Sequence, residues 1–233
     1  MLAKLEAKTK RMGTSVHLEN MSHQLASHAA EPRQLFRQFS MQIEPEERLA
    51  IVGNSGSGKS TLMSILAGLQ KPSDGKITFI CSKSGQALDV ARFRQRCSFI
   101  FQQFYLLPEL DVMHNVALPL TLRGDSKALT KSLVWLDKVG LAHVARASVT
   151  SLSNGEQQRV AIARALISSP EILFADEPVS HLDRDNAVQM FDLINEFCKA
   201  SATSLVLATR DIDLAKQVER YVTLAATSEA SAA

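Results

Sequence analysis

Several features that would assign a function class at once are missing from this sequence. No apolar run approaches the ~18 consecutive residues that cross a bilayer as a helix, and the charged stretch from Met1 to Lys10 lacks a hydrophobic signal segment. The three cysteines have no metal-ligand spacing and leave an odd count for disulfides, which favours buried thiols in a reducing compartment. A net charge of +2 is too small to indicate nucleic acid as a partner. We therefore expect a cytosolic protein, and a partner must supply any membrane-spanning part.

What is present is the hydrophobic patterning of one α/β domain. Residues 16–21 and 39–43 alternate apolar and polar positions, as half-exposed antiparallel strands do. Helical periodicity follows Lys59 and Asp183. Strand, helix and strand in this order predict a mostly parallel P-loop (RecA-like) sheet with an N-terminal antiparallel β-subdomain. The nearly continuous apolar runs typical of buried strands lie at 48–52, 98–101, 171–175 and 204–209.

The middle of the chain has a different pattern. This part has helix-like runs at 112–120 and 126–139 and no clear strand pattern. We therefore expect an inserted helical subdomain over about 104–158. The composition predicts one domain with short flexible ends and a turn near Pro32. The expected boundaries are a flexible leader at 1–14, a single domain at 15–225 and a flexible tail at 226–233.

A glycine-rich segment after the strand at 48–52 has the composition of a phosphate-binding loop. It fits the pattern G-x-x-x-x-G-K-S/T, which leaves kinases, GTPases and transport ATPases open. Glycines let backbone amides turn toward an anion, and the start of the next helix adds unpaired N–H groups. We expect Lys59 to reach the β- and γ-phosphates and the Ser60 hydroxyl to bind Mg²⁺. The candidate nucleotide contacts are Gly53, Asn54, Ser55, Gly56, Ser57, Gly58, Lys59, Ser60 and Thr61.

A second buried strand ends in two carboxylates, Asp176 and Glu177. Beside a P-loop in a parallel sheet, Asp176 is suited to bind Mg²⁺ and Glu177 to polarise the attacking water as a general base. Such a pair also commonly caps a turn. The upstream phosphate loop favours the chemical interpretation.

With these motifs in place, residues 15–224 resemble the ATP-binding cassette (ABC) family. The segment 152–160, Leu-Ser-Asn-Gly-Glu-Gln-Gln-Arg-Val, is similar to the family signature LSGGQ or LSGGE followed by QQRV. The resemblance implies that Ser153, Gly155 and Glu156 contact the nucleotide of a second cassette in a dimer. It also makes Gln102 the Q-loop glutamine that touches Mg²⁺, and makes residues 180–183 the D-loop at the dimer seam.

The segments 101–110 and 115–120 are similar to the cassettes of the macrolide-exporter and lipoprotein-releasing group. This resemblance implies an integral membrane permease as partner, a second cassette in a homodimer or heterodimer, and a peripheral location on the cytoplasmic face of the membrane. The apolar residues 104–107 either line a groove for a cytoplasmic helix of the permease or belong to the core of the helical subdomain. No metal beyond the Mg²⁺ of ATP is implied.

Three positions depart from the family pattern. Arg210 stands where the switch histidine is expected, and a guanidinium only donates hydrogen bonds. It could neutralise charge in the transition state, or it could pair with Glu177 and remove the base. Asn154 replaces the first signature glycine, and Leu25 takes the place of the aromatic residue that stacks on adenine, with His23 or Phe36 as substitutes. Together these changes predict slow turnover.

Two functions therefore remain open beside a less favoured small-molecule kinase. The first is a working ATPase subunit that powers export or extraction through the permease. The second is an ATP-gated clamp, the degenerate half of a heterodimer, which hydrolyses little. A kinase would leave the signature segment at 152–160 unexplained.

Overall fold

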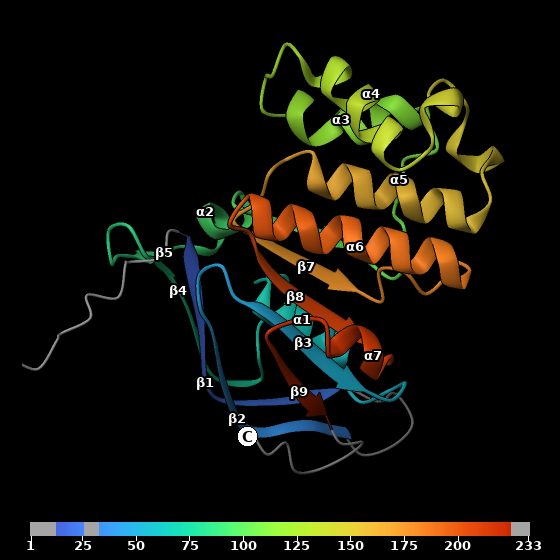
Figure 1. Ribbon diagram of the computed structural model, residues 1–233. Coiled ribbons are helices and arrows are strands. Elements are labelled where there is room, and N and C mark those ends of the chain that lie inside the picture. The colour runs from blue at the N-terminus through green and yellow to red at the C-terminus, as the bar shows by residue number, and fades with distance from the viewer. Residues whose placement is uncertain (1–12, 26–32, 225–233) are drawn as a thin grey trace, which may run out of the picture.

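A computed structural model describes residues 13–25 and 33–224 of the 233-residue chain, without the side chains of Leu25 and Arg33 (Figure 1). The expected tail, the turn near Pro32 and the leader up to residue 12 lie outside these residues. Thr14 already belongs to the first strand, and its hydroxyl donates a 2.6 Å hydrogen bond to Glu171 Oε2.

The N-terminal part forms the expected antiparallel sheet. Strand β1 (Thr14–Leu25) pairs with β2 (Arg33–Ile43) on one side and with β4 (Asp74–Cys81) on the other. The two-residue β5 (Ala87–Leu88) completes the order β2-β1-β4-β5. Bulges interrupt the β1–β2 register between Leu18 and Gln24. The first bulge falls inside the predicted segment 16–21, where two polar residues, Glu19 and Asn20, stand between Leu18 and Met21.

The second sheet is parallel throughout, with the strand order β6-β7-β8-β3-β9. In that order the strands are β6 (Cys97–Ile100), β7 (Ile172–Asp176), β8 (Ser204–Thr209), β3 (Arg48–Gly53) and β9 (Arg220–Leu224). Four of these strands confirm the predicted apolar runs. The carboxyl ends of β3 and β7 lie at the same edge, which is where a P-loop fold binds its ligand.

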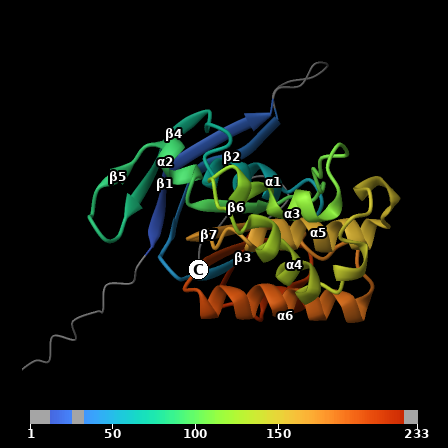
Figure 2. The same ribbon diagram turned by 90° about the horizontal axis from the view of Figure 1, so that it is seen from above.

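Alternate residues of the central strands face two separate hydrophobic clusters. In β7, Ile172 and Phe174 pack into the cluster shared with α1 (Lys59–Leu66) and the antiparallel sheet, so α1 lies between the two sheets (Figure 2). Leu173 and Ala175 pack on the opposite face, against α5 (Asn154–Leu166) and α6 (Arg184–Ala200). Both faces are buried, so these strands read as continuous apolar runs.

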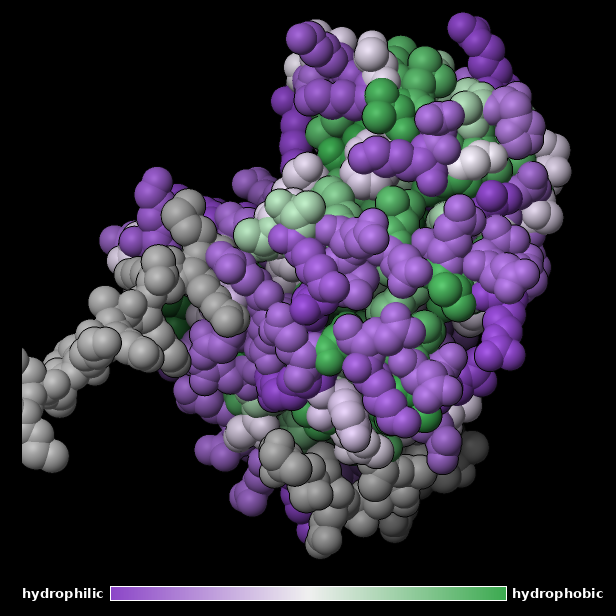
Figure 3. Space-filling model, in the orientation of Figure 1, coloured by the Kyte–Doolittle hydropathy of each residue, from purple (hydrophilic) through white to green (hydrophobic). Residues whose placement is uncertain are grey.

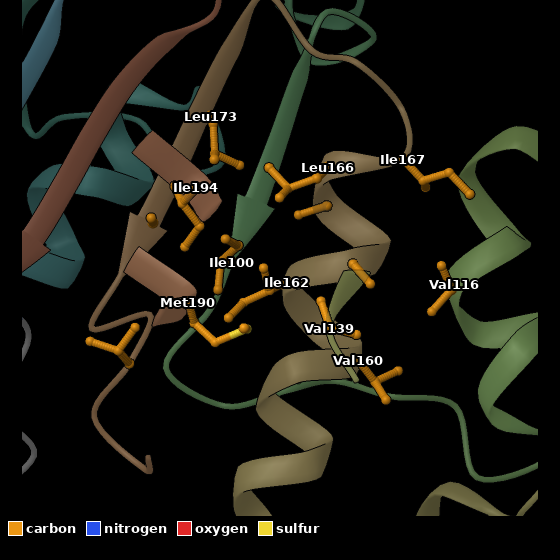
Figure 4. Close-up of a cluster of buried hydrophobic side chains, with 14 of the residues drawn as sticks. Ile100, Val116, Val139, Val160, Ile162, Leu166, Ile167, Leu173, Met190 and Ile194 are labelled. Carbon is orange, nitrogen blue, oxygen red and sulfur yellow. The ribbon is translucent and has the colours of Figure 1, made fainter. Parts of the chain in front are cut away.

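The helical subdomain contains α3 (Val112–Thr121), α4 (Ala128–Lys138) and the 3₁₀ turns η1 (Ala142–Val144) and η2 (Val149–Ser151), and it packs on α5 (Figures 1 and 4). Part of its surface is apolar (Figure 3), and exposed large hydrophobic side chains there include Leu122, Leu129, Leu133 and Val134. Figure 4 shows how α5 joins the two halves, because its side chains meet both the sheet and α3. The residues labelled there include Ile162, Leu166, Leu173, Met190 and Val116.

The two shortest α-helices were not predicted from the sequence. Helices α2 (Val90–Arg94) and α7 (Ile212–Ala215) have only five and four residues, too few for a helical period to appear. The expectation that all three cysteines are buried is wrong for Cys81 and Cys97, which are half-buried, whereas Cys198 is buried. All three are free thiols, as expected.

Candidate functional site

The phosphate loop connects β3 to α1 in a conformation that only glycine accepts easily. Gly56 and Gly58 have φ angles of 76° and 93°, in the left-handed region. A Cβ atom on Gly58 would also come within 2.8 Å of the Phe36 ring. The first helical turn after Gly58 has no side-chain cap, so its amides remain available to an anion.

Lys59 is buried and folds back over its own loop. Its Nζ donates to the carbonyl oxygens of Gly53 at 2.7 Å and Asn54 at 3.2 Å, and it lies 3.8 Å from Glu177 Oε1. Burial lowers the pKa of Lys59, although the charges of Glu177 and Asp176 oppose that shift. Two carbonyls and a carboxylate therefore hold the ammonium at the base of the loop.

Asp176 ends β7 at the floor of the site, with only 5% of its surface exposed. Burial raises its pKa, and a hydrogen bond with Ser60 partly offsets the shift. Within the described part of the chain, the buried Asp176 Oδ1 and Ser57 Oγ have no hydrogen-bond partner. Buried polar atoms are nearly always satisfied, so the Oδ1 of Asp176 indicates room for a polar ligand in the site, whereas Ser57 does not line the site. The Asp176 carboxylate and the Ser60 hydroxyl that it binds fit the oxygen ligands that Mg²⁺ prefers.

Glu177 follows directly and is held by two cations. Its carboxylate, 11% exposed, accepts a 3.2 Å bond from Arg210 Nε and lies near Lys59. Arg210, at the end of β8, is 58% exposed. Of the two roles considered for Arg210, this arrangement matches the pairing with Glu177. Glu177 itself has φ 48°, a left-handed conformation that non-glycine residues adopt at a cost.

These groups line one cavity of about 240 Å³. The structure thus brings together the loop, the end of β7, Gln102 and Arg210, as the motifs predict. Leu35, half-buried on β2, also faces this cavity and has no counterpart among the predicted residues. The predicted residues that line it are Ser55, Gly56, Gly58, Lys59, Ser60, Thr61, Gln102, Asp176, Glu177 and Arg210.

The expected adenine contact is only partly described. Leu25 is the last residue of β1, and the prediction about its side chain lies outside the described part. Its suggested substitutes, His23 and Phe36, are both 5% exposed. His23 is bound by Gln70 and Ser73, and Phe36 packs under Gly58. Both rings are buried in the ligand-free chain, and their contact with adenine stays a prediction.

The signature residues lie apart from this cavity within the single chain. Ser153 caps α5, and its amide and hydroxyl both donate to Glu156 Oε2, at 2.9 and 2.7 Å. These hydrogen bonds from Ser153 lower the pKa of Glu156. Gly155 lies beside Leu182 and the His181 carbonyl. None of the three lines the Lys59 cavity, which agrees with the expectation that they act on another molecule.

A second cavity of about 380 Å³ lies between the parallel sheet and the helical subdomain. Phe101, the exposed Tyr105 and Pro119 give it apolar walls. Arg164 and Arg123 also line it, and both donate to backbone carbonyls. In the parts of the chain that the structure describes, neither guanidinium forms an ion pair.

Two kinds of feature are absent from residues 13–25 and 33–224. Within these residues, no group of three or more His, Cys, Asp or Glu side chains could hold a metal ion. None of the helices in this part of the chain has both the length and the apolar character needed to cross a membrane.

The comparisons with known proteins agree with the site. The family model described as "ABC transporter" matches residues 36–180. The lipoprotein-releasing system ATP-binding protein LolD of Hydrogenovibrio crunogenus is 41% identical over 191 residues, covering 80% of this chain and 83% of that protein. LolD of Pseudoalteromonas translucida is 42% identical over 190 residues, covering 78% and 81%.

Solved structures place the fold in the same family. The ATP-binding cassette MJ0796, in a dimer bound to ADP and Pi, superposes with a TM-score of 0.80 at 31% identity, covering 90% of this chain and 94% of that one. A second dimeric structure of MJ0796 gives the same values. The sequence motifs, the fold and these relatives lead to one assignment: the chain belongs to the ABC transporter family, as an ATP-binding subunit of its ATPases.

Proposed function

We propose that this chain hydrolyses Mg-ATP in the Lys59 cavity and so drives a membrane permease that exports or extracts its cargo. The observation that carries this proposal is the unsatisfied, buried Asp176 Oδ1 beside Ser60 and Glu177. A protein keeps such a costly group where a ligand satisfies it.

The residues divide the work as follows. The amides of the glycine-rich loop and Lys59 bind the phosphates, with Ser60, Asp176 and Gln102 as ligands or water-mediated partners of Mg²⁺. Bound Mg²⁺ supplies neutralisation of the phosphate charge. Glu177 orients the attacking water and accepts its proton, because it is the carboxylate of the cavity that does not bind the metal.

Arg210 makes the availability of Glu177 as a base depend on bound nucleotide. In the described arrangement Arg210 and Lys59 both hold the Glu177 carboxylate. The phosphates of ATP attract both cations, so nucleotide binding competes with these pairs and frees Glu177. Residual pairing with Arg210 slows turnover. The same pairing supports the second candidate, an ATP-gated clamp that hydrolyses little.

The active unit is a dimer in which Ser153, Gly155 and Glu156 close over the nucleotide of the second subunit. Two observations support this: these residues do not line the chain's own cavity, and MJ0796 forms dimers. Asn154 begins α5 beside them, and its side chain crowds the approach to phosphate. Leu35 faces the cavity without an aromatic ring, which favours weak discrimination between bases.

The permease docks at the 380 Å³ cavity. Its apolar walls suit a short cytoplasmic helix. Its two guanidiniums, which form no ion pair with the residues that the structure describes, favour an acidic residue on that helix. The name of the LolD relatives supports a lipoprotein-releasing system as the setting. With the permease in the membrane, the chain lies on the cytoplasmic face. The chain forms a single domain up to about residue 225, which begins at Thr14 of β1 and not at residue 15.

The test is phosphate release by the chain co-purified with its permease. Glu177→Gln removes the base while keeping the shape of the side chain, so ATP hydrolysis should fall by a factor of about 10² or more while ATP binding persists. Glu219→Gln is a matched control, because Glu219 is a half-exposed partner of Arg48 away from the site. Equal hydrolysis by the Glu177→Gln variant and the parent protein would refute the proposal.

A further inference from the structure

The backbone of Glu177 is fixed on both sides of its Cα atom. Its N–H donates to the Ala208 carbonyl of β8 at 2.9 Å. Its carbonyl accepts three bonds, from Gln158 Nε2 at 3.2 Å, from Ser180 Oγ at 3.0 Å and from the Ser180 N–H at 3.2 Å. Because both flanking peptide groups are bound, the direction of the Cα–Cβ bond is set. The left-handed φ of 48° is held by these contacts.

Gln158 is an unusual member of this set. It lies on α5 with 1% of its surface exposed, at a position where the helix otherwise buries apolar residues. Both ends of its amide are used: Nε2 donates to Glu177, and Oε1 accepts from the His181 N–H at 3.0 Å. A buried amide satisfied at both ends specifies one geometry for its partners.

The location of Gln158 connects two parts of the proposed machinery. It follows Glu156 by two residues on the helix that begins with Ser153. His181, its second partner, lies in the segment between the base and α6, and the His181 carbonyl lies beside Gly155. A shift of α5 therefore moves the carbonyl of Glu177, because a single side chain links them.

We propose that Gln158 is a positioning residue, which aims the Glu177 carboxylate into the nucleotide cavity and makes that aim depend on the position of the signature helix. This inference rests on the proposed role of Glu177 in hydrolysis. Ser180 holds the same carbonyl through its hydroxyl and N–H, but within the described residues it has no hydrogen bond of its own to α5 and meets that helix only through its neighbour His181, which Gln158 also binds. Gln158 is the contact through which closure of a second subunit on Ser153 reaches the base.

The test compares two variants of Gln158 with a matched control. Gln158→Glu keeps the shape and the acceptor for His181 but loses the donor to Glu177. Gln158→Met loses both bonds without burying a charge, and it serves if the carboxylate variant does not fold. Gln189→Glu is the control, since Gln189 is exposed on α6 and lines neither of the two cavities.

In the complex with the permease, we expect kcat to fall on the order of tenfold to a hundredfold in the Gln158 variants, with KM and the Kd of Mg-ATP within about twofold of the parent. The Gln189→Glu control should retain the parent kcat. A kcat in Gln158→Met equal to that of the control overturns the proposal, as does a joint loss of kcat and nucleotide binding.

A crystal structure of the Gln158→Met chain decides the geometric part even if the parent protein proves unable to hydrolyse ATP. We expect Glu177 to leave the left-handed region and its carboxylate to move away from Lys59. Glu177 at an unchanged φ near 48°, with its carboxylate in place, overturns the inference whatever the activity. Failure of the proposed function is seen separately, as absence of hydrolysis by the parent complex.

Discussion

Replacing Arg210 with histidine tests how strongly this guanidinium restrains the base. Arg210 Nε lies 3.2 Å from Glu177 Oε1, but the arginine side chain is 58% exposed, so water and salt screen the pair. Exposed ion pairs contribute about 0.2–1 kcal/mol, and about 1 kcal/mol corresponds to roughly a fivefold change in population. Freeing Glu177 from Arg210 should therefore raise kcat by up to about fivefold. Histidine can also accept a hydrogen bond, which arginine cannot.

The assay is steady-state phosphate release by the permease complex at two ionic strengths. Salt should raise the rate of the parent protein relative to the Arg210→His variant, because screening weakens an ion pair that the variant lacks. Arg92→His is the control, since Arg92 forms an exposed ion pair with Asp89 and does not line the Lys59 cavity. A loss of tenfold or more in kcat on Arg210→His would refute the restraint and show that the arginine acts in the transition state.

Three other predictions follow from the same site and core. Because burial raises the pKa of Asp176, the native state binds its proton more tightly than the unfolded chain does, and stability without ligand falls as pH rises from the ordinary value of 3.8 through the raised one. Asp176→Asn should thus raise the Tm of the ligand-free protein at pH 7, by about 2–4 °C for each kcal/mol of unfolding free energy gained. Mg-dependent hydrolysis should be lost in the same variant. An unchanged or lower Tm in calorimetry would contradict this. Gly58→Ala should cost roughly 2–3 kcal/mol in denaturant titrations, since its Cβ meets Phe36 at 2.8 Å, whereas Gly56→Ala, with open space around its Cβ, should cost only about 1–2 kcal/mol; equal costs would argue against the close approach. Burial raises the pKa of Cys198 to about 12, while hydrogen bonds from Ser84 lower that of Cys81, so iodoacetamide at pH 8 should label Cys81 first, as read by mass spectrometry, and prior labelling of Cys198 would be inconsistent with the described burial.

The site could be predicted from sequence where its chemistry is local. The loop at 53–60 carries its own glycines, lysine and hydroxyl, and the carboxylates Asp176 and Glu177 follow a strand buried on both faces. Parallel pairing then brings the two segments to one edge without further information. Gln102 and Arg210, which also follow strands of this sheet, were predicted from the resemblance to the ABC family and not from this pairing.

The parts that were missed depend on distant contacts. Leu35 faces the cavity only because β2 passes the phosphate loop, and no pattern within β2 marks it. His23 has a ring that could stack on a base, but Gln70 and Ser73, about fifty residues away in the sequence, form hydrogen bonds with its two ring nitrogens. Gln158 carried a signal, since a polar residue at a core position of α5 needs two partners. Naming those partners required the fold.

Strand β7 is the shared wall of two interiors: Phe174 faces one and Leu173 the other. Neither hydrophobic cluster can be exposed to water without exposing β7. Thermal unfolding should therefore be a single cooperative transition of both clusters. Amide hydrogens of β7 should exchange slowest of all, only through complete unravelling, while the outlying pair α3 and α4 exchanges through partial openings.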